Sequence, residues 1–211
     1  VNARLSDRTF SSWMKMRWLA WIMFSPFSHI CVQCDEDARR FQSLGIDKKA
    51  IKVTGNIKFD QKVEPVMENE IYDLRHMVGA KTSQKIWIAG STHNGEEQII
   101  AESFGRIKKA EMDLMLVVAP RDPNRSKDVV KIFKASGFRT KSLTDIESNN
   151  DSGAPEVVVI DRIGLLRRLY AIADIALVGG SLIQIKGIGG HNPLEPAAFS
   201  KPIIFGKYMK N

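Results

Sequence analysis

The chain has 211 residues, of which 44% are hydrophobic and 26% are charged, and its formal net charge is +7. This composition is typical of a globular protein with a buried core, so disorder is not the default interpretation. The length allows one large domain or two small ones. The positive charge favours an anionic partner, whether nucleic acid, acidic lipid or a phosphorylated substrate.

Helices and strands are predicted from hydrophobic periodicity and from capping, glycine and proline signals. The expected helices cover residues 6–24, 35–44, 69–77, 95–109, 126–136, 165–171 and 193–199. The expected strands cover residues 29–33, 51–53, 85–89, 114–118, 138–141, 157–160, 175–178 and 202–205. Apolar strands that alternate with helices predict an α/β fold with a parallel, doubly wound sheet.

Two stretches lack a clear period. Residues 59–68, which include Pro65, form a candidate linker between a first domain at 1–58 and a second at 69–211. Residues 144–155 are polar and are expected to form an exposed loop.

The first expected helix ends in an apolar stretch, Trp13–Phe24, that holds three of the four tryptophans. Its uncharged part is too short to span a bilayer. Two interpretations remain: a core helix that exposes Lys15 and Arg17, or a Trp-rich basic surface that lies on anionic lipid.

The only two cysteines, Cys31 and Cys34, have C-x-x-C spacing. Three carboxylates follow them directly, at residues 35–37, and oppose formation of a thiolate. No further cysteine completes a zinc site, so neither redox nor metal function is expected.

Ligands of parallel sheets bind at the carboxyl ends of the strands, in the loops that follow. After the strand at 85–89, Ser91 and Thr92 either face a phosphate or simply cap the next helix. Glu96 and Glu97 are expected to do no more than suit the dipole of that helix.

Two further loops carry candidate ligand contacts. Arg121 follows the strand at 114–118 between two prolines, and its guanidinium suits a phosphate; the alternative is a surface pair with Asp122. Gly164 follows the strand at 157–160 and either supports a bound ribose or base or makes a plain turn.

The most informative stretch follows the strand at 175–178 and runs from Gly179 to Pro196. Its glycines allow close approach to a helix start at which Asn192 is the expected cap and Pro193 the first residue. Glu195 either completes a capping box or grips sugar or ribose hydroxyls.

With these loops identified, the sequence resembles the Kdo transferases of lipopolysaccharide assembly, which are glycosyltransferases of the GT-B fold. The resemblance rests on segments that occur in family order along nearly the whole chain: 2–8, 55–60, 90–93, 119–121 and 189–196. It implies a first Rossmann-like domain, of which 1–58 is the remainder, and a nucleotide-sugar donor domain at 69–211.

The resemblance also implies a donor, CMP-Kdo, and an acceptor, the phosphorylated lipid A precursor, on an anionic membrane surface at the cytoplasmic face of the bacterial inner membrane. The reaction is an inverting transfer with no cofactor and no obligatory metal. Nucleic acid is not an expected partner, since no basic helix face with interleaved aromatics is present.

The implied site residues fall into two groups. The donor site is expected to use Ser91, Thr92, Pro120, Arg121, Ile163, Gly164, Leu165, Gly180, Ser181, Gly190, His191, Asn192, Pro193, Leu194 and Glu195. The phosphates of the acceptor are expected to meet Arg4, Arg8 and Lys58.

Three features depart from the family pattern. The turn that usually reads Met-Gly-Glu is Ile163-Gly164-Leu165 here, and the loop between Ser181 and Gly189 is longer. The half-domain that carries the general-base glutamate is not among the matched segments, and neither are the helices that close the donor domain. The alternative to a transferase is therefore a truncated remnant that binds a cytidine nucleotide weakly or not at all.

We expect the isolated 211-residue polypeptide to lack transferase activity, because no general base is matched in it. The measurement is transfer of Kdo from CMP-Kdo to a lipid A precursor by the purified chain. Transfer above the background without enzyme would contradict the expectation.

Overall fold

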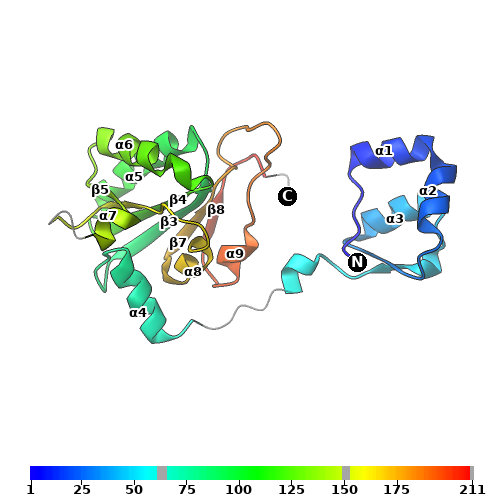
Figure 1. Ribbon diagram of the computed structural model, residues 1–211, viewed down its shortest axis with the longest axis horizontal. Helices are drawn as coiled ribbons and strands as arrows, with labels where there is room; N and C mark the ends of the chain where they lie inside the picture. The colour runs from blue at the N-terminus through cyan, green and yellow to red at the C-terminus, as the bar shows by residue number, and fades with distance from the viewer. Residues whose placement is uncertain (61–65, 149–152, 210–211) are drawn as a thin grey trace. The chain divides into compact units, whose positions relative to one another are not determined.

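The computed structural model describes residues 1–60, 66–148 and 153–209 (Figure 1). The chain divides into two compact units, Val1–Lys62 and Val63–Asn211. This division falls within the expected linker, whose residues 61–65 lie outside the described ranges. The flanks of the expected linker are ordered elements: η2 (Ile57–Asp60) is a 3-10 helix, and α4 begins at Glu68.

The first unit has a small parallel sheet with helices packed on it. Its elements are α1 (Asp7–Lys15), α2 (Arg17–Phe24), β1 (Ile30–Val32), α3 (Asp35–Ser43), η1 (Lys48–Ala50), β2 (Ile51–Val53) and η2. Strands β1 and β2 pair in parallel from Ile30 opposite Ile51.

The single helix expected over residues 6–24 is wrong, because the chain breaks at Met16, where φ is −119°. The break lets Trp13 of α1 meet Phe24 of α2 edge-on, with ring centroids 5.6 Å apart. Phe24 in turn contacts Phe41 of α3 at 5.4 Å. One aromatic cluster therefore holds all three helices together.

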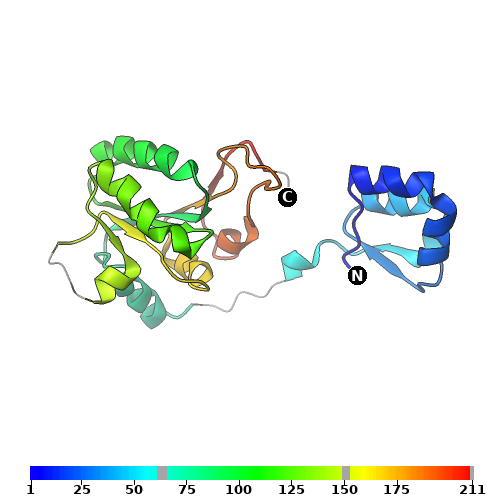
Figure 2. The ribbon, with the colours of Figure 1, turned by 45° about the horizontal axis from the view of Figure 1, so that its top comes forward.

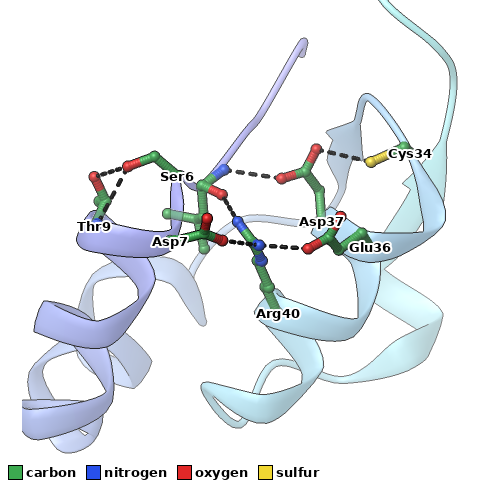
Figure 3. A network of polar contacts seen from close by, with 8 residues as sticks. Ser6, Asp7, Thr9, Cys34, Glu36, Asp37 and Arg40 are labelled. Carbon is green, nitrogen blue, oxygen red and sulfur yellow. Dashed lines mark hydrogen bonds and ion pairs between the residues drawn. The ribbon is translucent and has the colours of Figure 1, made fainter. Parts of the chain in front are cut away.

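Figure 3 shows a polar network that ties the N-terminal segment to α3. The carboxylate of Asp37 is buried and accepts hydrogen bonds from the backbone N–H of Leu5, at 2.9 Å, and from the thiol of Cys34, at 3.3 Å. Arg40 donates to the Leu5 carbonyl and pairs with two carboxylates, those of Asp7 and Glu36. The Cys34 thiol thus has a structural role in this network.

The second unit is a six-stranded parallel sheet in the order β5-β6-β4-β3-β7-β8. Its strands are β3 (Lys85–Thr92), β4 (Leu114–Pro120), β5 (Thr140–Ser142), β6 (Val157–Val159), β7 (Ile175–Val178) and β8 (Ile203–Phe205). Its helices are α4 (Glu68–Met77), α5 (Glu96–Ala110), η3 (Pro123–Arg125), α6 (Ser126–Ala135), α7 (Leu143–Glu147), α8 (Leu166–Leu169), η4 (Tyr170–Ile172) and α9 (Leu194–Ala197).

Helices cover both faces of this sheet (Figures 1 and 2). On one face α5 and α6 bury Phe104 and Phe133 against the sheet. On the other, α4, α7 and α8 bury Leu74, Leu143 and Leu169. Strand β4 is buried along its whole length, as expected for the centre of a doubly wound sheet. The predicted α/β fold with a parallel sheet is confirmed.

The strand order reverses at β3. From β3 the chain proceeds through β4 to one side of the sheet, whereas β7 and β8 lie on the other side. In open α/β sheets the crevice outside such a reversal, at the carboxyl ends of the strands, is where ligands bind. The loops after β3 and β7 are therefore the candidate ligand-binding loops.

Two local expectations are wrong. Residues 144–147 of the expected loop belong to α7, which has a capping box between Ser142 and Asp145; the loop's residues 149–152 lie outside the described ranges. The last expected helix is only one turn long, Leu194–Ala197. Within the described residues, no helix combines the length and apolar composition that crossing a bilayer requires.

Candidate functional site

A buried carboxylate joins the two loops at the reversal point. The side chain of Glu96, at the start of α5, is fully buried and accepts four backbone N–H groups. It receives hydrogen bonds from Gly180 at 2.8 Å, Ser181 at 3.0 Å, Leu182 at 2.9 Å and His93 at 2.9 Å. The expectation that Glu96 only suits the helix dipole is therefore wrong, because it fixes the loop after β7.

The neighbouring Glu97 is also fully buried, but its hydrogen-bond partners are side chains. It pairs with both terminal nitrogens of Arg125, at 2.9 and 3.2 Å, and accepts the hydroxyl of Thr92 at 3.1 Å. Glu97 thus ties β3 to η3, and it too does more than the expected dipole role. The Thr92 hydroxyl is buried and serves this structural bond rather than facing a ligand.

Ser181, a predicted donor contact, is likewise built into the framework. Its hydroxyl donates to the Val178 carbonyl at 2.5 Å and accepts from the backbone N–H of Gly206 at 2.9 Å, and the residue is fully buried. Its role in this structure is to fix the end of β7 against the segment after β8.

The two loops approach so closely that a Cβ cannot fit between them. A Cβ added at Gly179 would lie 2.3 Å from the carbonyl oxygen of Ser91, which itself has a positive φ of 56°. The predicted contact Ser91 is thus held in strained backbone at the end of β3. Close backbone packing of this kind needs glycine.

Two histidines meet across this junction. Nε2 of His93, after β3, lies 2.7 Å from Nε2 of His191, and the ring planes are within 5° of parallel. The backbone of the predicted contacts Gly190 and His191 is hydrogen-bonded to the Gly180 and Gly179 carbonyls, at 2.9 and 3.1 Å. Burial lowers the pKa of both imidazoles, and the positive charge of Arg121 acts in the same direction.

The helix start that follows His191 keeps part of the predicted arrangement. Asn192 accepts the backbone N–H of Leu194 at 3.1 Å, but α9 begins at Leu194 and Pro193 stands at the capping position, one residue later than expected. Glu195 lies near Tyr170: burial, together with the negative charge of Glu195, raises the pKa of Tyr170 above its ordinary value.

Tyr170 occupies the space that Gly90 leaves open. A Cβ at Gly90 would lie only 2.0 Å from the Tyr170 hydroxyl oxygen. The hydroxyl of Tyr170 therefore lies against the backbone at the carboxyl end of β3, a polar group that the sequence did not reveal.

Arg121 follows Pro120 at the end of β4, and its backbone N–H donates to the Thr92 carbonyl at 2.9 Å. The alternative of a pair with Asp122 is wrong, because Asp122 accepts from the backbone and side chain of Asn124 instead, at 3.0 and 2.9 Å. The Arg121 side chain is exposed, and no ion pair involves it in the described part of the chain.

The turn after β6 carries the last predicted donor contacts. Ile163 is 87% exposed, Gly164 has a φ of +89°, and Leu165 packs against the core on the α4 side of the sheet. The positive φ explains why glycine stands at this turn.

A cavity of about 640 Å³ lies beside His191. It is formed by the loop 184–191 together with Tyr208. Gly190, with a φ of +80°, is packed so tightly under Met209 that an added Cβ would lie 2.0 Å from the sulfur. The predicted loop residues therefore line a cavity next to the histidine pair.

The predicted acceptor contacts lie in the first unit. Arg4, Arg8 and Lys58 are all exposed. The side-chain oxygen of Asn2 accepts the backbone N–H of Ile57 at 3.2 Å, which joins the segment that carries Arg4 to the one that carries Lys58. Among the described residues no group of three or more His, Cys, Asp or Glu side chains is placed to hold a metal ion.

Three residues of the site were missed from the sequence: His93, Glu96 and Tyr170. His93 stands in a motif segment, so its position after β3 was a usable signal. Glu96 and Tyr170 gave none, because a carboxylate at a helix start and a tyrosine in an apolar helix have ordinary local explanations.

This geometry, a parallel sheet with a polar crevice at the reversal of strand order, is that of the GT-B glycosyltransferases. A glycosyltransferase from Rickettsia africae has the same fold over 98% of this chain and 50% of its own, with a TM-score of 0.50 at 13% identity. The C-terminal CMP-Kdo binding domain of WaaA from Acinetobacter baumannii is 27% identical with a TM-score of 0.53, covering 65% of this chain and 70% of that domain.

Sequence comparison shows which glycosyltransferases this chain resembles. Residues 1–61 match the family model of 3-deoxy-D-manno-octulosonic-acid transferase, or Kdo transferase. The Kdo transferase of Haemophilus influenzae is 37% identical over 213 residues, covering all of this chain and 48% of its own. A bifunctional glycosyltransferase/methyltransferase of Fusobacterium nucleatum is 35% identical, covering all of this chain and 32% of its own.

The resemblance to the Kdo transferase family is therefore confirmed over the whole chain. The chain spans about half or less of the length of these curated relatives.

Replacing Glu96 with glutamine is expected to lower the free energy of unfolding by roughly 2–4 kcal/mol. The amide nitrogen of glutamine would face N–H donors, and the charge that strengthens the remaining bonds would be lost. Urea denaturation measures the change. Glu102→Gln, an exposed position on the same helix, is the matched control. Equal stability of the two variants would contradict the assigned role.

Proposed function

We propose that this chain supplies the CMP-Kdo binding site of a Kdo transferase that acts on the lipid A precursor in lipopolysaccharide biosynthesis. The confirmed family resemblance supports the choice of donor. The observation that carries the proposal is the meeting of three loops at the reversal of strand order: the backbone N–H of Arg121 donates to the Thr92 carbonyl, and the His93 and His191 rings are in contact.

Three parts of the site suit parts of a cytidine nucleotide. The exposed guanidinium of Arg121 can pair with a phosphate oxygen through two N–H groups. At the start of α9, the carboxylate of Glu195 can accept hydroxyl groups of the sugar or the ribose. The turn Ile163–Leu165, with its glycine at positive φ, offers bare backbone for the base or ribose.

The proposed reaction is an inverting displacement at the anomeric carbon of Kdo with CMP as the leaving group. In it the cationic and N–H groups of the site stabilise the negative charge that develops on the phosphate. We assign this chain the binding of the donor and no catalytic residue, and we propose no cofactor and no metal.

For the acceptor we propose contact between its phosphates and Arg4, Arg8 and Lys58, all of them exposed cations of the first unit. The same unit carries an apolar face on α2, where Trp18, Trp21 and Ile22 are 69%, 54% and 51% exposed at helical spacing. Together with the exposed Lys15 and Arg17, that face suits the headgroup region of an anionic membrane. The proposed location is the cytoplasmic face of the bacterial inner membrane.

Arg121→Ala is expected to weaken the binding of CMP by the chain about tenfold or more, since one charge-assisted contact contributes roughly 1.5–3 kcal/mol. Asn192→Ala is expected to weaken it as well, because the segment that leads into α9 loses the hydrogen bond from the Leu194 N–H. Isothermal titration calorimetry measures both. Arg106→Ala, which removes an exposed cation on α5, should bind like the parent chain. Failure of the parent chain to bind CMP would refute the donor site.

The double substitution Trp18→Ser and Trp21→Ser is expected to lower binding to vesicles that contain phosphatidylglycerol by about tenfold or more. Co-sedimentation measures the bound fraction. Neutral phosphatidylcholine vesicles should bind the parent chain less, and high salt should weaken its binding to the phosphatidylglycerol vesicles. Met112→Ser, which removes an exposed apolar side chain of the second unit, is the control. Equal binding by parent and double variant would contradict the membrane contact.

A further inference from the structure

The hydrogen bond between His93 and His191 determines which of their ring nitrogens carry protons. Their Nε2 atoms are 2.7 Å apart, a distance at which one nitrogen must donate a proton and the other must accept it. When both rings are neutral, the donor ring carries its proton on Nε2 and the acceptor ring carries its own on Nδ1. The neutral pair therefore has one Nδ1–H group and one bare Nδ1.

One added proton changes the protonation of the Nδ1 atoms without breaking the hydrogen bond between the rings. It occupies the bare Nδ1, so that both Nδ1 atoms become N–H donors and the pair carries a positive charge. The bond between the two Nε2 atoms persists. A second proton would leave two donors facing each other at 2.7 Å and would separate the rings. The pair is thus built to take up one proton and no more.

The surroundings keep the pair neutral while no anion is bound. Burial lowers the pKa of both rings, and for His93 the positive charges of Arg125 and Arg121 add to this effect. The His191 ring is similarly affected by His93 itself and by Arg121.

The carboxylates that face the pair raise the pKa of its imidazoles, but each carboxylate already accepts hydrogen bonds from other groups. Glu96 raises the pKa of both rings and Glu97 that of His93, yet burial outweighs them. Glu96 accepts four backbone N–H groups, and Glu97 pairs with Arg125. An anion that entered beside the pair would supply the negative charge that favours the added proton.

We propose that the His93–His191 pair, with Arg121, receives the phosphate of the donor nucleotide, and that binding draws one proton from solvent onto the pair. This assigns His93 a place in the donor site, beside His191, which lines the cavity of about 640 Å³. The inference rests on the proposed function, since it takes a cytidine phosphate as the ligand.

The sign of the pH dependence follows from the proton balance. The complex holds more protons than the free chain, so affinity for the phosphate rises as the pH falls through the neutral range. With one proton taken up, the limit is about a tenfold change in affinity per pH unit. The dependence ends once the free pair is itself protonated.

The test uses the full 211-residue chain and the methyl phosphodiester of CMP, whose phosphate does not titrate near neutrality. Calorimetric titrations at about pH 6.5, in buffers with different heats of ionisation, give the number of protons taken up per ligand bound. The parent chain is expected to take up a proton fraction that approaches about one. His93→Gln keeps the His191 ring but removes its titratable partner, and is expected to lose most of the uptake and of the pH dependence.

His76→Gln, a histidine substitution on α4 outside the site, should keep the uptake of the parent chain. Binding of the diester without proton uptake, or with the same uptake in His93→Gln, overturns the proton coupling and leaves the donor site intact. No binding by the parent chain overturns the proposed function itself. Because uptake is counted per bound ligand, a loss of folded protein in the variant does not mimic the expected result.

Discussion

The carboxylate of Glu96 is the constraint on which the site depends. It is fully buried and pairs with no cation among the residues that the structure describes; four backbone N–H groups and the start of α5 stabilise its charge instead. Charge-assisted hydrogen bonds of this kind each contribute roughly 1.5–3 kcal/mol, which offsets the cost of burying the charge. Three of the donors belong to the loop after β7 and one to the loop after β3, so a single side chain sets the geometry of both.

The glycines on either side of this carboxylate follow from the same constraint. The loops can converge on Glu96 only if their backbones touch, and at Gly179 a Cβ would lie 2.3 Å from the Ser91 carbonyl oxygen. At Gly90 the missing Cβ admits the Tyr170 hydroxyl. The two backbones therefore pack directly against each other at this junction. His93 and His191 face each other across it, with their Nε2 atoms 2.7 Å apart.

The sequence predicted the alternation of elements well because uniformly apolar strands and capped helices are local signals. The strands at 51–53 and 175–178 have the bounds predicted for them. Long-range contacts decided what was missed. The break at Met16 depends on Trp13 meeting Phe24, and the role of Glu96 depends on N–H groups more than 80 residues away. Thr92 and Ser181 were predicted as ligand contacts because their hydroxyls stand at strand ends, yet both hydroxyls bond within the framework.

The division of the chain places the two proposed binding surfaces in different units. Every group that shapes the donor crevice, from Glu96 to the histidine pair and the start of α9, belongs to Val63–Asn211. The hydrogen bonds that set its geometry lie within that unit. The exposed cations and tryptophans of α1, α2 and their flanks belong to Val1–Lys62, which has its own aromatic core. The proposed nucleotide site and the proposed lipid-contacting surface therefore rest on separate cores, and a substitution in one core should leave the other intact.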